Sequence, residues 1–148
     1  MTHYSDALEW MDLADIALSK EMFRKSVYHS CMAIELLLKH VAVRHVTDAD
    51  NRYAHNHRGL WNLVTAYYGD MLPLSIAKLS MKYLNISRYT SREGHAQFTE
   101  DFAKGFILHS NEVKSYVDSH CGGDTEEIPE GIYTGSYDSL RISINQDS

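Results

Sequence analysis

Charged residues inside an apolar run are the first feature of this sequence that could support chemistry. Glu35 and Lys39 lie within the segment Ala-Ile-Glu-Leu-Leu-Leu-Lys at residues 33–39. An acid four residues before a base lies on the same helix face and can pair with it. A charge among so many leucines needs a partner. We therefore expect either an ion pair that fixes the packing of this helix, which is the preferred interpretation, or two groups that line a ligand pocket.

Two further positions could contact an anionic ligand. His57 directly precedes an apolar segment, where it can cap a helix or contact a ligand. Arg88 and Tyr89 close another apolar segment, where Arg88 can grip a phosphate or satisfy the carbonyls of a helix end. The candidate ligand-binding residues are Glu35, Lys39, His57, Arg88 and Tyr89. Trp10 and the tyrosines are interpreted as core and interface residues rather than as platforms for bases.

His95, one of nine histidines, lies in a polar stretch after Arg88. A histidine titrates near neutrality and can move a proton at a ribose hydroxyl, and Arg88, seven residues earlier, could stabilise charge on the phosphate. An exposed loop histidine with no such role is the alternative.

Other chemistries lack their sequence patterns. No His-Glu-x-x-His or paired Cys-x-x-Cys motif occurs, and His55-x-His57 has no obvious third ligand. Neither a Gly-rich phosphate loop nor a Gly-x-Ser-x-Gly elbow is present. Cys31 lies in an apolar helical pattern and is expected to pack as a small hydrophobic residue. The sequence predicts no metal and no cofactor.

Helical segments must position these residues. Apolar residues recur with a period of 3.6 over residues 5–19, 21–45, 60–68, 73–89 and 99–121. The first face is Trp10, Leu13, Ala14, Ala17 and Leu18. The second segment has the widest apolar face, formed by Val27, Cys31, Ala33, Ile34, Leu36, Leu37, Leu38 and Val41, so it is expected at the centre. The polar residues 47–59 are expected to be a connection, and Thr99 is the expected N-cap of the last helix.

Length and charge complete this prediction. The 148 residues fit a single domain, with no apolar run long enough to cross a bilayer and no apparent signal peptide, so we expect a cytoplasmic protein without membrane contact. The net charge of −6 is uneven, because six acidic residues and only Arg141 lie in 121–148. We predict an all-α, four- to five-helix antiparallel up-and-down bundle over residues 1–120. Residues 121–148 are predicted to be an acidic polar tail, either disordered or forming a short hairpin or arm.

The order of these motifs resembles that of the HEPN family of small helical domains. The resemblance consists of Trp-Met-Asp-Leu-Ala at 10–14, Cys-Met-Ala-Ile-Glu-Leu-Leu-Leu-Lys at 31–39, His-Arg-Gly-Leu at 57–60 and Arg88-Tyr89. It implies a helical bundle, usually a homodimer, associated with nucleotides or RNA. The family includes metal-independent endoribonucleases with an Arg-x4–6-His motif at the dimer interface. It also includes non-catalytic members, some of which act beside a nucleotidyltransferase as a toxin–antitoxin pair.

Three segments have the Arg-x4–6-His spacing: Arg24 to His29, Arg52 to His57 and Arg88 to His95. Only the last lies where the resemblance places the motif. It departs from the catalytic branch, because Tyr89 replaces the usual small polar residue after the arginine. Ser91 and Gly94 also suggest that the chain leaves the helix before His95.

Three functions stay open at this point. The preferred one is a non-catalytic domain that binds nucleotide or RNA and acts with a partner, such as a nucleotidyltransferase, in a toxin–antitoxin or defence module. The second is a metal-independent endoribonuclease that uses Arg88 and His95 at a dimer interface. The third is a helical protein-interaction module without a ligand.

Overall fold

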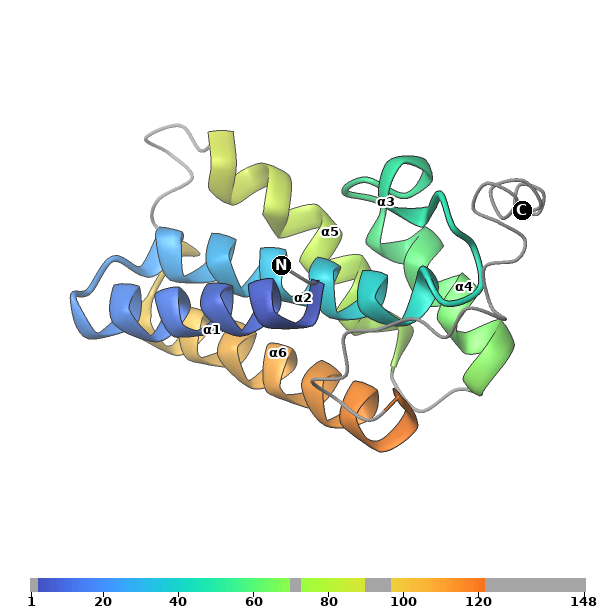
Figure 1. Ribbon diagram of the computed structural model, residues 1–148. Helices are drawn as coiled ribbons and strands as arrows, with labels where there is room; N and C mark the ends of the chain where they lie inside the picture. Colours follow the sequence, from blue (N-terminus) through green and yellow to red (C-terminus); the bar gives the residue numbers. More distant parts are fainter. Residues whose placement is uncertain (1–2, 70–72, 90–96, 122–148) are drawn as a thin grey trace.

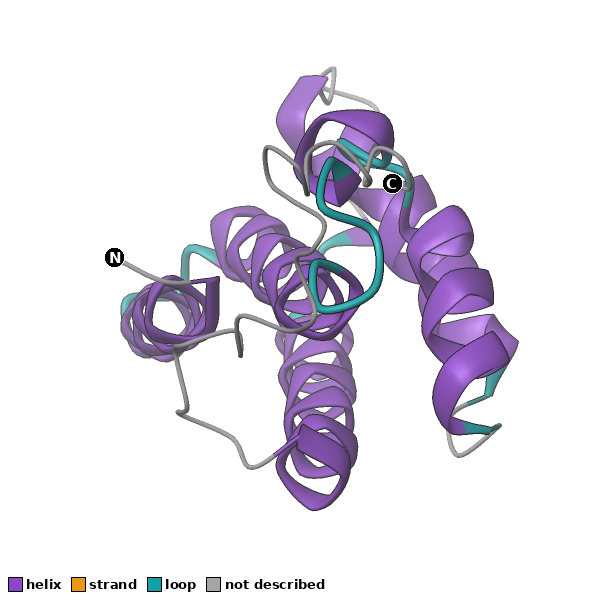
Figure 2. Ribbon diagram, turned by 45° about the vertical axis from the view of Figure 1, so that its right-hand side comes forward, coloured by secondary structure: helices purple, strands orange, loops and turns teal. Residues whose placement is uncertain are grey.

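All regular secondary structure in the described part of the chain is helical. The computed structural model describes residues 3–69, 73–89 and 97–121, except for the side chains of Asp50, Tyr89 and Cys121. The helices in these ranges are α1 (His3–Ser19), α2 (Phe23–Ala42), α3 (Ala49–Arg52), α4 (His57–Tyr68), α5 (Leu74–Tyr89) and α6 (Glu100–Cys121). Helices and loops alone make up the coloured ribbon in Figure 2. The predicted all-α bundle is confirmed, while the predicted tail lies outside the described residues.

Helix α2 is the centre of the bundle. It contacts α1, α4, α5 and α6, and α1 runs antiparallel beside it (Figure 1). The predicted apolar face of α2 is buried throughout, apart from Leu36, which is partly exposed. A helix that is apolar on several sides must be covered on several sides, and this requirement fixes α2 as the core element.

Two hydrophobic clusters fill the space around α2. The first surrounds Ile34, Leu37 and Leu38 and includes residues of α1, α4 and α6. The second surrounds Val27, Cys31 and Leu84 and includes Phe98, Ala103 and Phe106. Cys31 is a free, fully buried thiol, and burial raises its pKa above the usual value, so it packs as the expected hydrophobic residue.

Several local predictions are corrected. Of the predicted face of α1, Ala14 and Ala17 are buried together with Tyr4 and Ala7, whereas Leu13 lies beside this face and is 43% exposed. The connection at 47–59 contains the single turn α3. The cap of α4 is Asn56, whose side chain accepts a hydrogen bond from Gly59 N, so the expected capping role of His57 is wrong. Thr99 does cap α6, accepting from Phe102 N at 3.2 Å.

Candidate functional site

Glu35 is the centre of a buried polar network. Its side chain is 2% exposed and pairs with Lys39 Nζ at 3.0 Å, which is the predicted ion pair along one face of α2. His57 Nε2 lies 3.0 Å and His55 Nδ1 2.9 Å from the same carboxylate oxygen, Oε1. The backbone N–H of His55 donates to the other oxygen at 3.2 Å. Burial alone would raise the pKa of Glu35, but the hydrogen bonds from His57, His55 and Lys39 outweigh it and hold that pKa far below its ordinary value.

His57 extends this network to α5. Its ring is fully buried, and its Nδ1 lies 2.7 Å from Ser80 Oγ, which in turn donates to the carbonyl of Ala77 at 3.1 Å. The order Ser80, His57, Glu35 has the composition of a hydrolase triad. However, Ser80 is 0% exposed, so no substrate can reach its hydroxyl. The network joins α2, the start of α4 and α5, and its hydrogen bonds tie these three helices together.

Arg88 contacts the buried network through His55, whose side chain is exposed. Arg88 Nη2 lies 3.4 Å from His55 Nε2. A guanidinium can only donate hydrogen bonds, so His55 Nε2 must be the acceptor and the proton of His55 lies on Nδ1, where it is donated to Glu35. The predicted ligand residues Glu35, His57 and Arg88 thus belong to one connected set, in which Glu35 and His57 are buried, Arg88 is partly exposed and the linking His55 is exposed. The side chain of Tyr89 and all of His95 lie outside the described residues.

Arg88 also lines a basic pocket between the N-terminal half of α2 and the C-terminal end of α5. This pocket, called here the basic pocket, has a volume of about 340 Å³. Its lining residues are Arg24, Lys25, Tyr28, His29, Ser87 and Arg88. Arg24 Nη1 donates to the carbonyl of Ser87, which ties the two helices together and satisfies an end carbonyl of α5.

The charge of the basic pocket is strongly positive. Arg24, Lys25 and Arg88 are cations at neutral pH, and none of the six lining residues is acidic. Burial lowers the pKa of His29, and the charge of Lys25 lowers it further, so His29 is neutral near pH 7. Trp10 of α1 packs on His29 and Tyr28 with ring centroids 5.1 and 5.9 Å apart and fixes this wall. The arrangement can bind an anion and offers it aromatic contacts.

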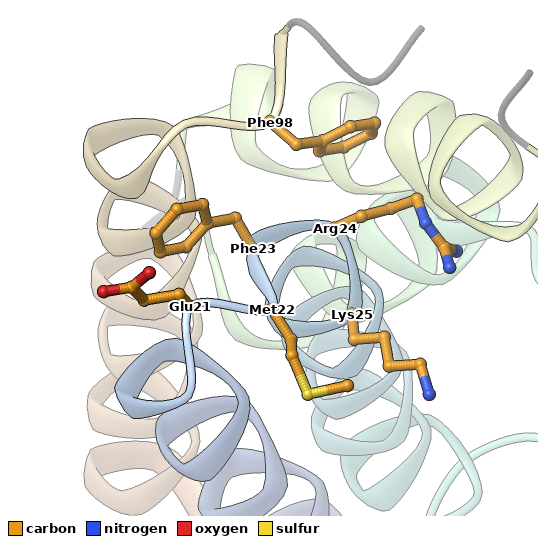
Figure 3. A pocket seen from close by; sticks show the side chains of 6 residues that line it. All are labelled: Glu21, Met22, Phe23, Arg24, Lys25 and Phe98. Atoms are coloured by element: carbon orange, nitrogen blue, oxygen red, sulfur yellow. The ribbon is translucent and has the colours of Figure 1, made fainter. Parts of the chain in front are cut away.

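A second pocket of about 280 Å³ opens at the beginning of α2 (Figure 3). Its lining residues are Glu21, Met22, Phe23, Arg24, Lys25 and Phe98. Phe98, from the segment before α6, faces the first turn of α2 across this space. Met22, the N-cap, makes no side-chain hydrogen bond to the first turn. We call this space the α2-entry pocket; it shares Arg24 and Lys25 with the basic pocket and therefore adjoins it.

The structure divides the predicted site residues into two groups. Glu35, Lys39 and His57 are buried and engaged with one another, whereas Arg88 lines the basic pocket. Arg24, Lys25, Tyr28 and His29 are not among the site residues predicted from the sequence. A signal for two of them existed in the Arg24 to His29 spacing, but only the packing of α5 on α2 shows that this segment meets Arg88.

Across 3–69, 73–89 and 97–121, no group of three or more His, Cys, Asp or Glu side chains could hold a metal ion. None of the helices in that part of the chain is long and apolar enough to span a membrane.

The fold and the pocket define a small helical bundle with a basic pocket between two of its helices. A family model, the HEPN domain, matches residues 2–120. The chain therefore belongs to the HEPN domain family, as the resemblance of its motifs predicts. Neither the curated proteins nor the solved structures gave a match.

Proposed function

We propose that this HEPN domain binds the phosphate groups of a nucleotide or of RNA in the basic pocket. The carrying observation is that Arg24, Lys25 and Arg88, from two helices, converge on one pocket in which none of the described lining residues is acidic. Such a set of cations attracts phosphate, and arginine adds two parallel donors of matching geometry. The family association with nucleotides and RNA supports the same ligand class.

The domain acts in this proposal as a binding module rather than as a nuclease. Arg88 already contacts His55, which is held by Glu35, so its guanidinium has a structural role that a purely catalytic arginine would not need. The chemistry would then come from a partner, such as a nucleotidyltransferase in a toxin–antitoxin or defence module. The binding domain itself would be a homodimer of two copies of this chain. The endoribonuclease that uses Arg88 and His95 stays a prediction. If the wild type cleaves RNA in EDTA and both Arg88→Ala and His95→Ala abolish this cleavage, the protein is that endoribonuclease and the binding-module proposal is wrong.

The test is the affinity of a short fluorescent oligoribonucleotide, measured by anisotropy at several salt concentrations. Lys25→Glu should weaken binding about tenfold and reduce the slope of log affinity against log salt by roughly one, because one phosphate contact is lost. The matched control is Lys78→Glu, which makes the same charge change at another exposed helical lysine that lines neither pocket. Equal losses in both variants, or no binding by the wild type, would contradict the proposal.

A further inference from the structure

We propose that the α2-entry pocket holds the nucleoside of the ligand whose phosphate occupies the basic pocket. This inference rests on the proposed function and names its second half, the group recognised beside the phosphate. The two pockets share Arg24 and Lys25, so a ligand bound between these side chains can occupy both. Each volume is near the lower end of the range for small-molecule sites, and the two pockets together lie within it.

One pocket has a charged lining and the other a partly apolar lining, and a nucleotide likewise has a charged phosphate and a largely apolar base. The described residues that line the basic pocket include three cations and no acid, which suits phosphate. The α2-entry pocket adds Met22, Phe23 and Phe98; Met22 is exposed and Phe23 partly exposed, and phosphate alone would leave this apolar surface in contact with water. A flat heteroaromatic base covers such side chains and gains from contact with aromatic rings. Arg24 and Lys25 line both pockets. The phosphate and the base would therefore be recognised on opposite sides of these two side chains.

The apolar wall is already in place without a ligand. Phe98 is 7% exposed and makes edge contacts with Tyr83 and Phe102, with ring centroids 6.5 and 5.9 Å apart. Its ring therefore cannot swing away, and little conformational entropy is lost when a base is placed against it. In Figure 3 the Glu21 carboxylate lies on the side of Phe23 and is directed away from Phe98.

Met22 is the side chain that allows a test without loss of the fold. It lines the pocket and is 41% exposed, so its removal leaves the core intact. Leu13, on α1, is 43% exposed and lines neither pocket, which makes Leu13→Ala a matched control. Met22→Leu keeps the apolar volume and should retain binding. Melting temperatures of all variants verify that each one folds.

The experiment compares inorganic phosphate, ribose 5-phosphate, the four nucleoside 5′-monophosphates and a tetraribonucleotide by calorimetric titration of the full chain. At least one nucleotide should bind about tenfold more tightly than ribose 5-phosphate, because its base adds a contact with an aromatic wall. Met22→Ala should weaken nucleotide binding about fivefold, in proportion to the apolar contact removed, and leave ribose 5-phosphate unchanged. Comparison of the monophosphates with the tetranucleotide separates a free nucleotide from RNA as the source of the same chemistry.

The outcomes keep the two proposals distinct. If no probe binds, the phosphate site itself is wrong. If ribose 5-phosphate binds as tightly as every nucleotide, the phosphate site stands and the nucleoside pocket is overturned. The nucleoside pocket is likewise overturned if Met22→Ala lowers the affinity of both ligand types equally, or if Leu13→Ala has the same effect as Met22→Ala.

Discussion

At the scale of single residues, Glu35 shows why a charge in an apolar run is informative. The carboxylate is almost fully buried and has three side-chain partners from two segments of the chain. Burying it without them would be strongly unfavourable, so the partners are a condition of the fold. The same residues would be poor ligand contacts, because each donor is already directed at Glu35.

A substitution at Glu35 tests this structural role. Glu35→Gln should lower the free energy of unfolding by about 3 kcal/mol, because Lys39 then remains buried without its counter-charge. Urea denaturation at pH 7 measures the change. Glu112→Gln is the control, since that carboxylate is 61% exposed and should be nearly neutral. A loss at Glu35 no larger than at Glu112 would contradict the role.

The pH dependence follows from the lowered pKa of the same group. A carboxyl whose pKa is lower in the folded state stabilises the protein above its unfolded pKa, near 4.5, and loses that effect as the pH falls towards the folded pKa. The wild type should therefore lose stability below pH 4.5 more steeply than Glu35→Gln does.

At the scale of helices and turns, the periodic pattern predicts the bundle and its central helix. Local repetition suffices for this, because the buried face of a long helix depends on its own residues, as along α2. The basic pocket could not be predicted in the same way. Arg24 and Arg88 are 64 positions apart in sequence, and only the packing of α5 on α2 makes them neighbours. Arg88 could be predicted as a ligand residue because it stands at the end of an apolar segment, whereas Arg24 stands at no such segment end.

The turn between α1 and α2 offers a prediction at this scale. Glu21 has a φ of +61°, and Met22 N bonds to Ala17 O while Glu21 N bonds to Leu18 O, which is the Schellman arrangement that favours glycine. Glu21→Gly should stabilise the protein by about 1 kcal/mol, because the left-handed backbone strains a residue with a Cβ. The melting temperature should rise by roughly 3 °C. Glu9→Gly, within α1, should lower it by a similar amount, and a fall in both variants would contradict this account of the turn.

At the scale of the whole molecule, charge is divided between a nearly neutral body and an acidic C-terminal segment. Residues 1–120 hold 13 basic and 14 acidic residues, whereas 121–148 hold one basic and six acidic residues. A phosphate ligand approaching the basic pocket therefore meets a chain whose net field is repulsive. Such a long-range effect is screened by salt, with a Debye length of about 10 Å at 0.1 M, whereas contacts inside the pocket are screened much less.

A variant of the full chain tests this division. In it, the six acidic residues beyond position 120 are changed to the corresponding amides. Oligoribonucleotide affinity should rise several-fold at about 0.01 M salt, where the Debye length is roughly 30 Å, and the gain should shrink near 0.15 M. Lys25→Glu should weaken binding at both salt concentrations, since it removes a direct contact. Stopped-flow anisotropy should place the amide effect in the association rate, because steering acts before contact. A gain of equal size at both salt concentrations, or one confined to the dissociation rate, would mean that the acidic segment competes for the pocket directly instead of repelling the ligand from a distance.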